Sequence, residues 1–201
     1  MNSLSRSLGG LGTSLSLATL SCGATGAVAA HNDASYDVRT ASPLMHWPAE
    51  FAPGHVDVFL HNQVEIHASP RIVWENLVAA GQWPSWYANS SDVQIQGSAG
   101  SLKLGSRFLW RTFGFPADST VVEFVPESRL SWSGGPETFR IYHAWLIIPQ
   151  GEGCLVITEE AQKGSEALRF HREQPNAMLD GHDWWLSALK ARSEHVAQGS
   201  K

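Results

Sequence analysis

The feature that most constrains this chain is a regular alternation of apolar and polar residues between positions 56 and 68. In the segment "VDVFLHNQVEIHA", every second residue is apolar, with Asn62 as the exception. Because successive side chains of a strand point to opposite faces, this pattern predicts a long β-strand with one buried face. Such a strand needs partners beside it and a second layer that covers its apolar side.

Helix signals follow this strand directly in "SPRIVWENLVAAG". Ser69 is a favoured N-cap, Pro70 suits the first helical position, and Gly81 is expected to end the helix. The next segment, "WPSWY", has room for only a short second helix, which we expect Pro84 to start. The sequence therefore predicts two short helices after the first strand.

About six antiparallel strands are expected next, separated by Gly, Asn and Pro residues. The segments "DVQIQG" and "SRFLWRTFG" each predict one strand, and "STVVEFVPESRLSWSGG" predicts two that turn at residues 126–128. "TFRIYHAWLIIP" and "CLVITEEAQ" complete the set as a hairpin joined by "QGEG". In "SRFLWRTFG", Arg107 and Arg111 mark the solvent face, so Phe108 and Trp110 are expected to point inward.

A long helix is expected over residues 176–197, and Pro175 separates it from a turn formed by "SEALRFH". Its buried stripe follows helical spacing and consists of Met178, Leu179, His182, Trp185, Leu186, Leu189 and Val196. An antiparallel sheet with one apolar face needs a cover, and this helix is the element long enough to provide it. We therefore predict an α+β fold in which a curved antiparallel sheet wraps around the long C-terminal helix.

The N-terminal residues differ in composition from the rest of the chain. Residues 1–30 contain one charged residue, Arg6, and no aromatic residue, and Ala27-Val28-Ala29 fits a small-x-small cleavage pattern. We predict a secretory signal peptide over residues 1–30, with a Gly/Ser-rich tail or a misassigned start site as alternatives. Cleavage would place the protein in the periplasm or outside the cell; the alternative location is the cytoplasm.

The segment that follows the expected leader shows no regular apolar spacing. We expect residues 31–55 to form an extended arm, with Trp47, Pro48 and Phe51 attaching it to the domain. The domain itself is expected to span residues 56–198.

Several classes of function find no support in the sequence. The net charge is −5 and no basic stripe is present, so nucleic acid is not an expected partner. No apolar run reaches the length of about 18 residues that a membrane span needs. The sequence has no HExxH or CxxC motif and no Gly-rich phosphate loop, so we expect no metal site and no cofactor. Ser69, Ser131 and Ser133 lack the context of a nucleophile elbow.

The chain is rich in tryptophan, with 9 in 201 residues, and "WENLVAAGQWPSWY" alone contains three. The order of elements and the stretches "VEIHASPRIVWENL", "QWPSWY", "VVEFVPESRLSW" and "YHAWLIIPQGEGCLVITEE" resemble the SRPBCC superfamily. That group includes START-type lipid-transfer domains and polyketide cyclases. The resemblance covers residues 56–197 and implies the helix-grip fold, whose sheet and long helix enclose a cavity for an apolar ligand. The resemblance implies that Trp83 and Trp86 mainly close one end of the sheet and partly form the entrance of the cavity.

The resemblance also implies which side chains face that cavity. Alternation places Thr158, Glu160 and Gln162 on one face of their strand and Glu159 on the other, without choosing between the faces. The family pattern implies that Glu160 points inward. The expected ligand-binding residues are Phe108, Trp110, Trp132, His143, Trp145, Thr158, Glu160, His182 and Trp185.

An inward Glu160 beside His143 or His182 would form a proton-transfer pair, and these three residues are the catalytic candidates. A hydrogen-bonded structural role is the alternative for each of them. We therefore expect a carrier or sensor that binds a hydrophobic or aromatic small molecule, lipid- or polyketide-like. The alternatives are a cyclase or dehydratase acting on a polyketide-like substrate, and an interaction module of the heat-shock-activator type.

Overall fold

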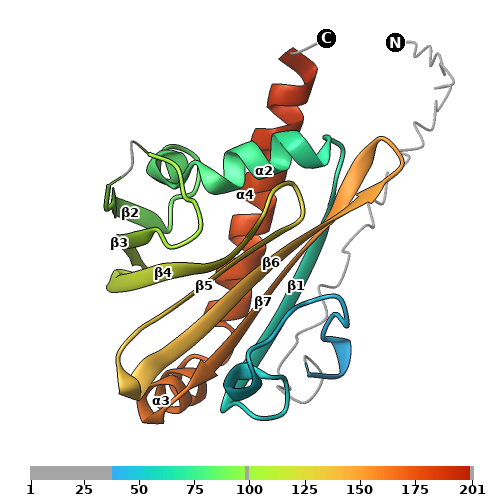
Figure 1. Cartoon of the computed structure of the whole chain (residues 1–201). Coiled ribbons are helices and arrows are strands. Elements are labelled where there is room, and N and C mark those ends of the chain that lie inside the picture. The colour runs from blue at the N-terminus through green and yellow to red at the C-terminus, as the bar shows by residue number, and fades with distance from the viewer. Residues whose placement is uncertain (1–37, 98–99, 200–201) are drawn as a thin grey trace, which may run out of the picture. The chain divides into compact units, whose positions relative to one another are not determined.

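The computed structural model describes residues 38–97 and 100–199. The expected signal peptide and the first residues of the expected arm lie outside these ranges. Within them, an antiparallel sheet curves around the long C-terminal helix, and short helices follow the first strand (Figure 1). The predicted α+β helix-grip fold is therefore confirmed.

The sheet contains seven strands among the described residues, in the order β1-β7-β6-β5-β4-β3-β2. Each neighbouring pair is antiparallel. In this order the first strand of the chain pairs with the last. The strands are β1 (Val58–Ile66), β2 (Ser90–Ile95), β3 (Arg107–Thr112), β4 (Phe115–Val125), β5 (Arg129–Gly134), β6 (Arg140–Gln150) and β7 (Gly153–Lys163).

The two helices expected after the first strand and the long C-terminal helix are present, together with short helices that the sequence did not predict. The helices are η1 (Ala49–Phe51), α2 (Pro70–Val78), η2 (Ala80–Ser85), η3 (Glu137–Phe139), α3 (Ser165–Glu173) and α4 (Ala177–Gly199). Ser69 caps α2 as expected, because its side chain accepts a hydrogen bond from the amide of Ile72. The second helix begins at Ala80 rather than at Pro84, so Gly81 lies inside it. The segment expected to form a turn before Pro175 is the helix α3.

The main core lies between the concave face of the sheet and α4. Trp83 is fully buried there, and its ring contacts those of Phe108, Trp110, Trp132 and Trp185. Its indole N–H donates to the carbonyl of Leu77, which satisfies the polar atom of a large buried ring. Trp83 is thus a core residue that closes this end of the sheet.

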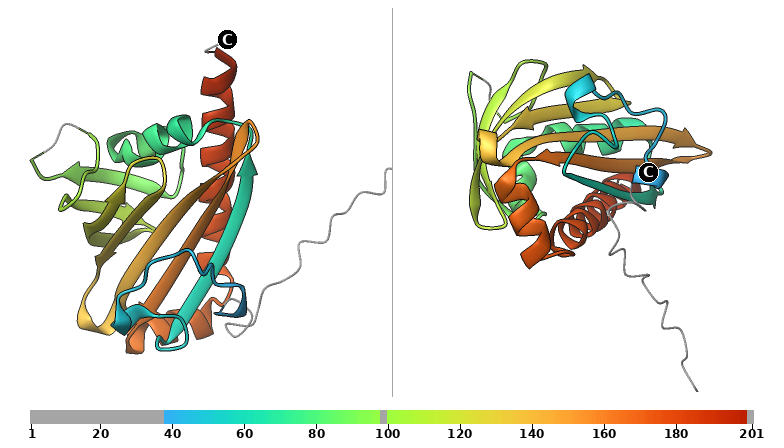
Figure 2. Two further views of the ribbon diagram at one scale, coloured as in Figure 1. Left: turned by 45° about the vertical axis from the view of Figure 1, so that its right-hand side comes forward. Right: turned by 90° about the horizontal axis from the view of Figure 1, so that it is seen from below.

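The opposite face of the sheet is also covered, which the sequence did not predict for β1. Residues 38–56 pack over β1, β6 and β7, on the side opposite to α4 (Figures 1 and 2). Met45 and Phe51 are buried, and Trp47 contacts the rings of Phe59 and Tyr142. Both faces of β1 are therefore buried over its first half, and the described part of the expected arm, residues 38–55, packs on the sheet.

Candidate functional site

A cavity of about 1000 Å³ lies between the sheet and the first turns of α4. Trp110, Trp132 and Trp185 line it with apolar surface, together with Phe113 and Phe170. The exposed charged side chains that also border it mark its solvent-facing rim, namely Arg107, Asp118 and Arg169. The cavity is therefore apolar inside and charged where it opens.

Three polar side chains line the buried end of this cavity, and each comes from a different element. His143 stands on β6, Glu160 on β7 and His182 on α4. His143 and Glu160 are direct cross-strand partners, so the sheet register alone brings them together. His182 reaches them because helical spacing puts it on the stripe of α4 that faces the sheet.

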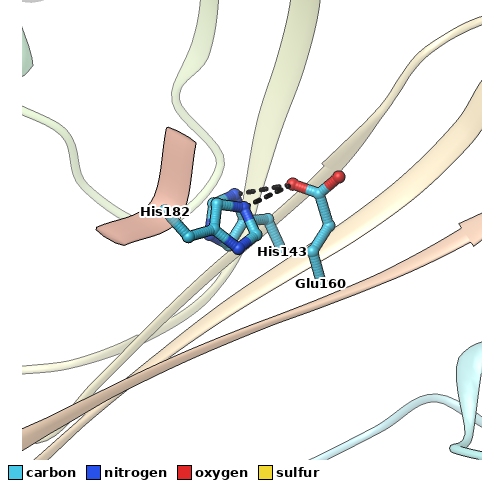
Figure 3. Close-up of side chains that lie close together, drawn as sticks. All are labelled: His143, Glu160 and His182. Carbon is cyan, nitrogen blue, oxygen red and sulfur yellow. Dashed lines mark ion pairs between the residues drawn. The ribbon is translucent and has the colours of Figure 1, made fainter. Parts of the chain in front are cut away.

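The three side chains converge on one oxygen atom. Nδ1 of His143 lies 3.0 Å from Oε2 of Glu160, and Nε2 of His182 lies 3.6 Å from the same oxygen. Both imidazole rings point toward the carboxylate in Figure 3. All three residues are at least 96% buried, since the exposed fraction is 3% for His143, 4% for Glu160 and 2% for His182.

A second set of residues fixes the orientation of this cluster. Thr158 Oγ1 lies 2.7 Å from Nε2 of His143, and Asn62 Oδ1 lies 3.2 Å from Nδ1 of His182. The side-chain amide of Gln162 donates to Oε1 of Glu160 over 2.6 Å. The polar atoms of the three side chains that point away from the centre of the cluster therefore each have a hydrogen-bond partner, as buried polar groups require.

The electrostatic environment favours an ionised Glu160. Burial by itself raises the pKa of a carboxyl group, but the two neighbouring histidines outweigh it and hold the pKa of Glu160 well below its ordinary value. For His143, burial lowers the pKa and the contact with Glu160 opposes that shift only in part. In both groups, burial and the contact between the carboxylate and the imidazole therefore shift the pKa in opposite directions.

Buried indole groups add unused hydrogen-bond donors beside the cavity. Nε1 of Trp132, Trp145 and Trp185 is buried without a hydrogen-bond partner among the described residues. Trp132 and Trp185 line the cavity. A buried donor without a partner costs roughly 1–3 kcal/mol, so an acceptor on a bound molecule would be favoured here.

The structure brings together most of the residues expected to form the site. Trp110, Trp132, His143, Glu160, His182 and Trp185 all line the cavity. Phe108 and Trp145 are fully buried in the core, and Thr158 is also fully buried, with its hydroxyl on His143. These three residues are not part of the lining.

Sequence reasoning missed several residues that shape the site. Asn62 interrupts the apolar alternation of β1, and this interruption was the signal that it has an inward polar role. The Phe170 ring centroid lies 6.5, 6.3 and 6.2 Å from those of Phe113, Phe115 and Phe139, near the rim. No periodic pattern marks this group, because its members come from a turn, from the first residue of β4 and from two short helices.

The sequence contains no metal-binding motif, and we therefore expected no metal site. The structure nevertheless places ligand atoms of His143, Glu160 and His182 within 4.8 Å of one another. Linear spacing could not reveal this group, because its members are 17 and 22 positions apart. Chemically, the group can hold a metal ion, move a proton or bind a polar atom of a ligand.

No helix among the described residues is long and apolar enough to cross a membrane.

Solved structures with the same fold include proteins of several kinds. A hypothetical protein from Helicobacter pylori, jhp0584, is 32% identical, with a TM-score of 0.70; the match covers 76% of this chain and 98% of that one. The di-domain ARO/CYC protein StfQ of the steffimycin biosynthetic pathway is 13% identical, with a TM-score of 0.59 over 70% of this chain and 51% of that one. Norcoclaurine synthase from Thalictrum flavum is 14% identical, with a TM-score of 0.54 over 69% and 92%.

Curated proteins yield no match to this sequence. The family described as "Polyketide cyclase / dehydrase and lipid transport" matches residues 58–194, which is most of the described domain. The matched region runs from β1 into α4 and contains the whole His143, Glu160 and His182 cluster. The chain belongs to the polyketide cyclase/dehydrase and lipid transport family.

Proposed function

We propose that this protein binds a hydrophobic or aromatic small molecule, lipid- or polyketide-like, as a carrier or sensor. The observation that carries this proposal is the apolar cavity of about 1000 Å³ with one polar cluster at its buried end. Small-molecule sites are typically concave and apolar, measure about 300–1,000 Å³, and have a few convergent polar groups that orient the ligand. The family description, which includes lipid transport, agrees with this function.

The polar atoms of the cavity favour a ligand that carries oxygen. The unpaired indole N–H groups of Trp132 and Trp185 are donors, and they suit carbonyl or hydroxyl oxygens on an otherwise apolar molecule. The three tryptophan rings of the lining offer flat surfaces for an aromatic or conjugated system. An oxygenated aromatic or polyketone-like ligand therefore meets both requirements.

A cavity-filling substitution tests the proposal without removing a core side chain. Ala117 lines the cavity on β4, and Val122 lies on the same strand outside it, 44% exposed. Ala117→Trp is expected to abolish binding of the apolar fluorophore phenylnaphthylamine, while Val122→Trp leaves it unchanged. Native mass spectrometry of the unsubstituted protein should also detect a co-purified small molecule, and Ala117→Trp should lose it.

Equal fluorophore binding by the unsubstituted protein and both folded variants would show that the cavity is not the binding site. No binding by the unsubstituted protein would contradict the proposal altogether. An interaction module that uses its outer surface would then be the better interpretation.

The geometry of the cluster favours a second function, that of a cyclase or dehydratase on a polyketide-like substrate. Oε2 of Glu160 lies 3.0 Å from Nδ1 of His143, and the Glu160 side chain lines the cavity. A carboxylate in this position can remove a proton from a carbon between two carbonyl groups. The resulting enolate attacks another carbonyl carbon, and the carboxylic acid formed at Glu160 returns the proton to the alkoxide.

A measurement of turnover distinguishes a carrier from a cyclase or dehydratase. Glu160→Gln keeps the shape of the side chain but removes the base, so an enzyme should lose about 10²-fold or more in turnover of a poly-β-ketone while binding survives. A carrier should lose no more than one hydrogen bond, about 1 kcal/mol of binding free energy. If the unsubstituted protein produces no cyclised or dehydrated product, the second function is excluded for that substrate.

We also propose that the protein acts outside the cytoplasm. The composition of residues 1–30 supports this location, since it is typical of a cleaved leader. N-terminal sequencing of protein from its native host should find a start near Ala30 or His31. Intact Met1 would contradict export.

A further inference from the structure

In the cluster of His143, Glu160 and His182, each residue directs one atom into the same small volume. Nδ1 of His143 and Nε2 of His182 approach Oε2 of Glu160 to 3.0 and 3.6 Å. Figure 3 shows both ring edges directed at that oxygen, from opposite elements. What occupies the space between these atoms depends on which of them carry hydrogen.

The outer nitrogen of His143 is a donor. Oγ1 of Thr158 lies 2.7 Å from Nε2 of His143, and the Thr158 hydroxyl donates its own hydrogen to the carbonyl of Ala144 over 3.4 Å. Since the hydroxyl has one hydrogen, its contact with the ring must accept a hydrogen from Nε2. In the neutral ring, Nδ1 therefore presents a lone pair to Glu160.

The same reasoning applies to His182. The side-chain amide nitrogen of Asn62 donates to the carbonyl of Leu179 and to Asp183, over 3.2 and 2.8 Å. Its oxygen, Oδ1, is therefore the atom that meets Nδ1 of His182 at 3.2 Å, and it accepts a hydrogen. In the neutral ring, Nε2 also presents a lone pair to Glu160.

Two nitrogen lone pairs and one carboxylate oxygen thus converge in a buried site. All three are acceptors, so the arrangement requires a positive species among them. One proton can bridge only one nitrogen to the oxygen, and two protons would place two buried cations beside one carboxylate. A metal cation bonds all three at once.

We propose that His143, His182 and Glu160 bind a divalent transition-metal ion of the zinc or iron(II) class. Two histidines and one carboxylate form a ligand set that such ions prefer, and the outer hydrogen bonds to Thr158 and Asn62 are the supports that metal-bound histidines usually have. This proposal replaces the expectation of no metal site. It does not depend on which molecule occupies the apolar cavity.

The spacing of the three atoms fits this kind of ion. With bonds of about 2.0–2.1 Å to nitrogen and oxygen, the ligand atoms of a tetrahedral ion lie about 3.3 Å apart. The observed nitrogen–oxygen separations of 3.0 and 3.6 Å lie on either side of that value, and the two histidine nitrogens, which lie within 4.8 Å of each other, would have to be within about 4.2 Å to share one ion. All three residues line the cavity, so the remaining coordination position opens toward it and can take a water molecule or a ligand oxygen.

Metal titration of the tag-free, chelator-treated full chain tests the site. Co²⁺ should bind at one ion per chain and produce visible absorption bands that report nitrogen coordination, and Zn²⁺ should displace it. Zn²⁺ should also raise the melting temperature of the unsubstituted protein. Glu160→Gln should weaken Zn²⁺ binding by about 100-fold or more, and Thr158→Val by about 10- to 100-fold.

The neighbouring residue supplies a matched control. Glu159 is buried on the other face of β7 and contacts a single histidine, His61, at 2.7 Å. Glu159→Gln should leave Zn²⁺ affinity and the Co²⁺ spectrum unchanged. His182→Gln offers a second test should Glu160→Gln fail to fold.

Two results would overturn the proposal. One is that the unsubstituted protein binds neither ion in the micromolar range. The other is that binding persists in folded Glu160→Gln and His182→Gln proteins, which would assign it to surface histidines such as His46 and His55. Neither result bears on phenylnaphthylamine binding, so the metal site and the proposed ligand cavity can fail separately.

Discussion

Two adjacent glutamates on β7 show how the surroundings of a residue determine its role. Glu160 faces the cavity and meets two histidines, while Glu159 faces the outer side and accepts from the amide of Ser42 over 2.6 Å. His61 also contacts Glu159, so each carboxylate has an imidazole beside it. The outer carboxylate attaches the N-terminal segment to the sheet, and the inner one belongs to the candidate site.

A substitution at Glu159 should therefore loosen the N-terminal segment and leave the cavity unaffected. In Glu159→Gln, the Ser42 amide donates to a neutral oxygen instead of a charged one, which costs about 1 kcal/mol. Hydrogen exchange at the Ser42 amide should become roughly fivefold faster, since 1.4 kcal/mol corresponds to about tenfold. Amides of α4 serve as the internal control, and unchanged exchange at Ser42 would mean that apolar packing alone holds the segment.

At this scale the sequence predicted pairs of residues but not their orientation. Alternation placed Glu160 and Thr158 on one face of β7, and Glu159 on the other, correctly. It could not choose the inner face, because residues 38–56 cover the outer side and make both sets buried. The family resemblance made that choice. The convergence of His182 on Glu160 depends on where α4 crosses the sheet, which local periodicity does not contain.

At the scale of elements, the turn between β3 and β4 rests on α4 where the Phe113 ring lies against Gly181. A Cβ added to Gly181 would lie 2.1 Å from Cζ of Phe113, so the ring occupies the space that any other residue at position 181 would fill. The amide of Phe113 donates to Asn89, and the Tyr87 hydroxyl donates to the carbonyl of Gly181. Because Phe113 also lines the cavity, this contact links the turn to the site.

Gly181→Ala should displace the Phe113 ring without unfolding the protein. The gain in helix propensity, up to about 1 kcal/mol, offsets part of the lost contact. Losing ~40–60 Å² of contact with a bound molecule costs about 1–1.5 kcal/mol, so phenylnaphthylamine should dissociate roughly 5- to 10-fold faster in stopped-flow measurements. In a Phe113→Leu background, the same glycine substitution should have little further effect. An equal effect in both backgrounds would show that the contact does not control the cavity.

The elements themselves were predictable wherever local signals were strong. Ser69 and Pro70 fixed the start of α2, and the glycines of "QGEG" fixed the β6–β7 hairpin. The helix α3 was expected to be a turn because its segment is short and its apolar residues are few, with only Ala167 fully buried. Its position depends on packing against η3 and the sheet, which is tertiary information.

At the scale of the whole domain, the two largest apolar cores of the described residues lie on opposite faces of the sheet and differ in size. The larger core holds α4 and the cavity, and the smaller one holds residues 38–56 against β1, β6 and β7. Exposed ion pairs such as Arg140 with Glu50 also join the N-terminal segment to the sheet, but such pairs contribute about 0–1 kcal/mol. Burial of Met45 and Phe51 contributes about 1.5–3 kcal/mol for each side chain. Apolar packing is therefore what joins this segment to the domain.

Two truncations test whether the fold needs this second core. Removing residues 1–30 deletes none of the described contacts, so the melting temperature should match that of the full chain. Removing residues 1–52 deletes Met45, Trp47 and Phe51 and uncovers Phe59 and Tyr142. The loss of about 3–6 kcal/mol is a large part of the roughly 5–15 kcal/mol of a typical domain. At about 2–4 °C for each kcal/mol, the melting temperature should fall by roughly 6–24 °C. Equal melting temperatures for both truncated proteins would mean that the sheet and α4 are sufficient, and that residues 38–52 only shield a surface that tolerates water.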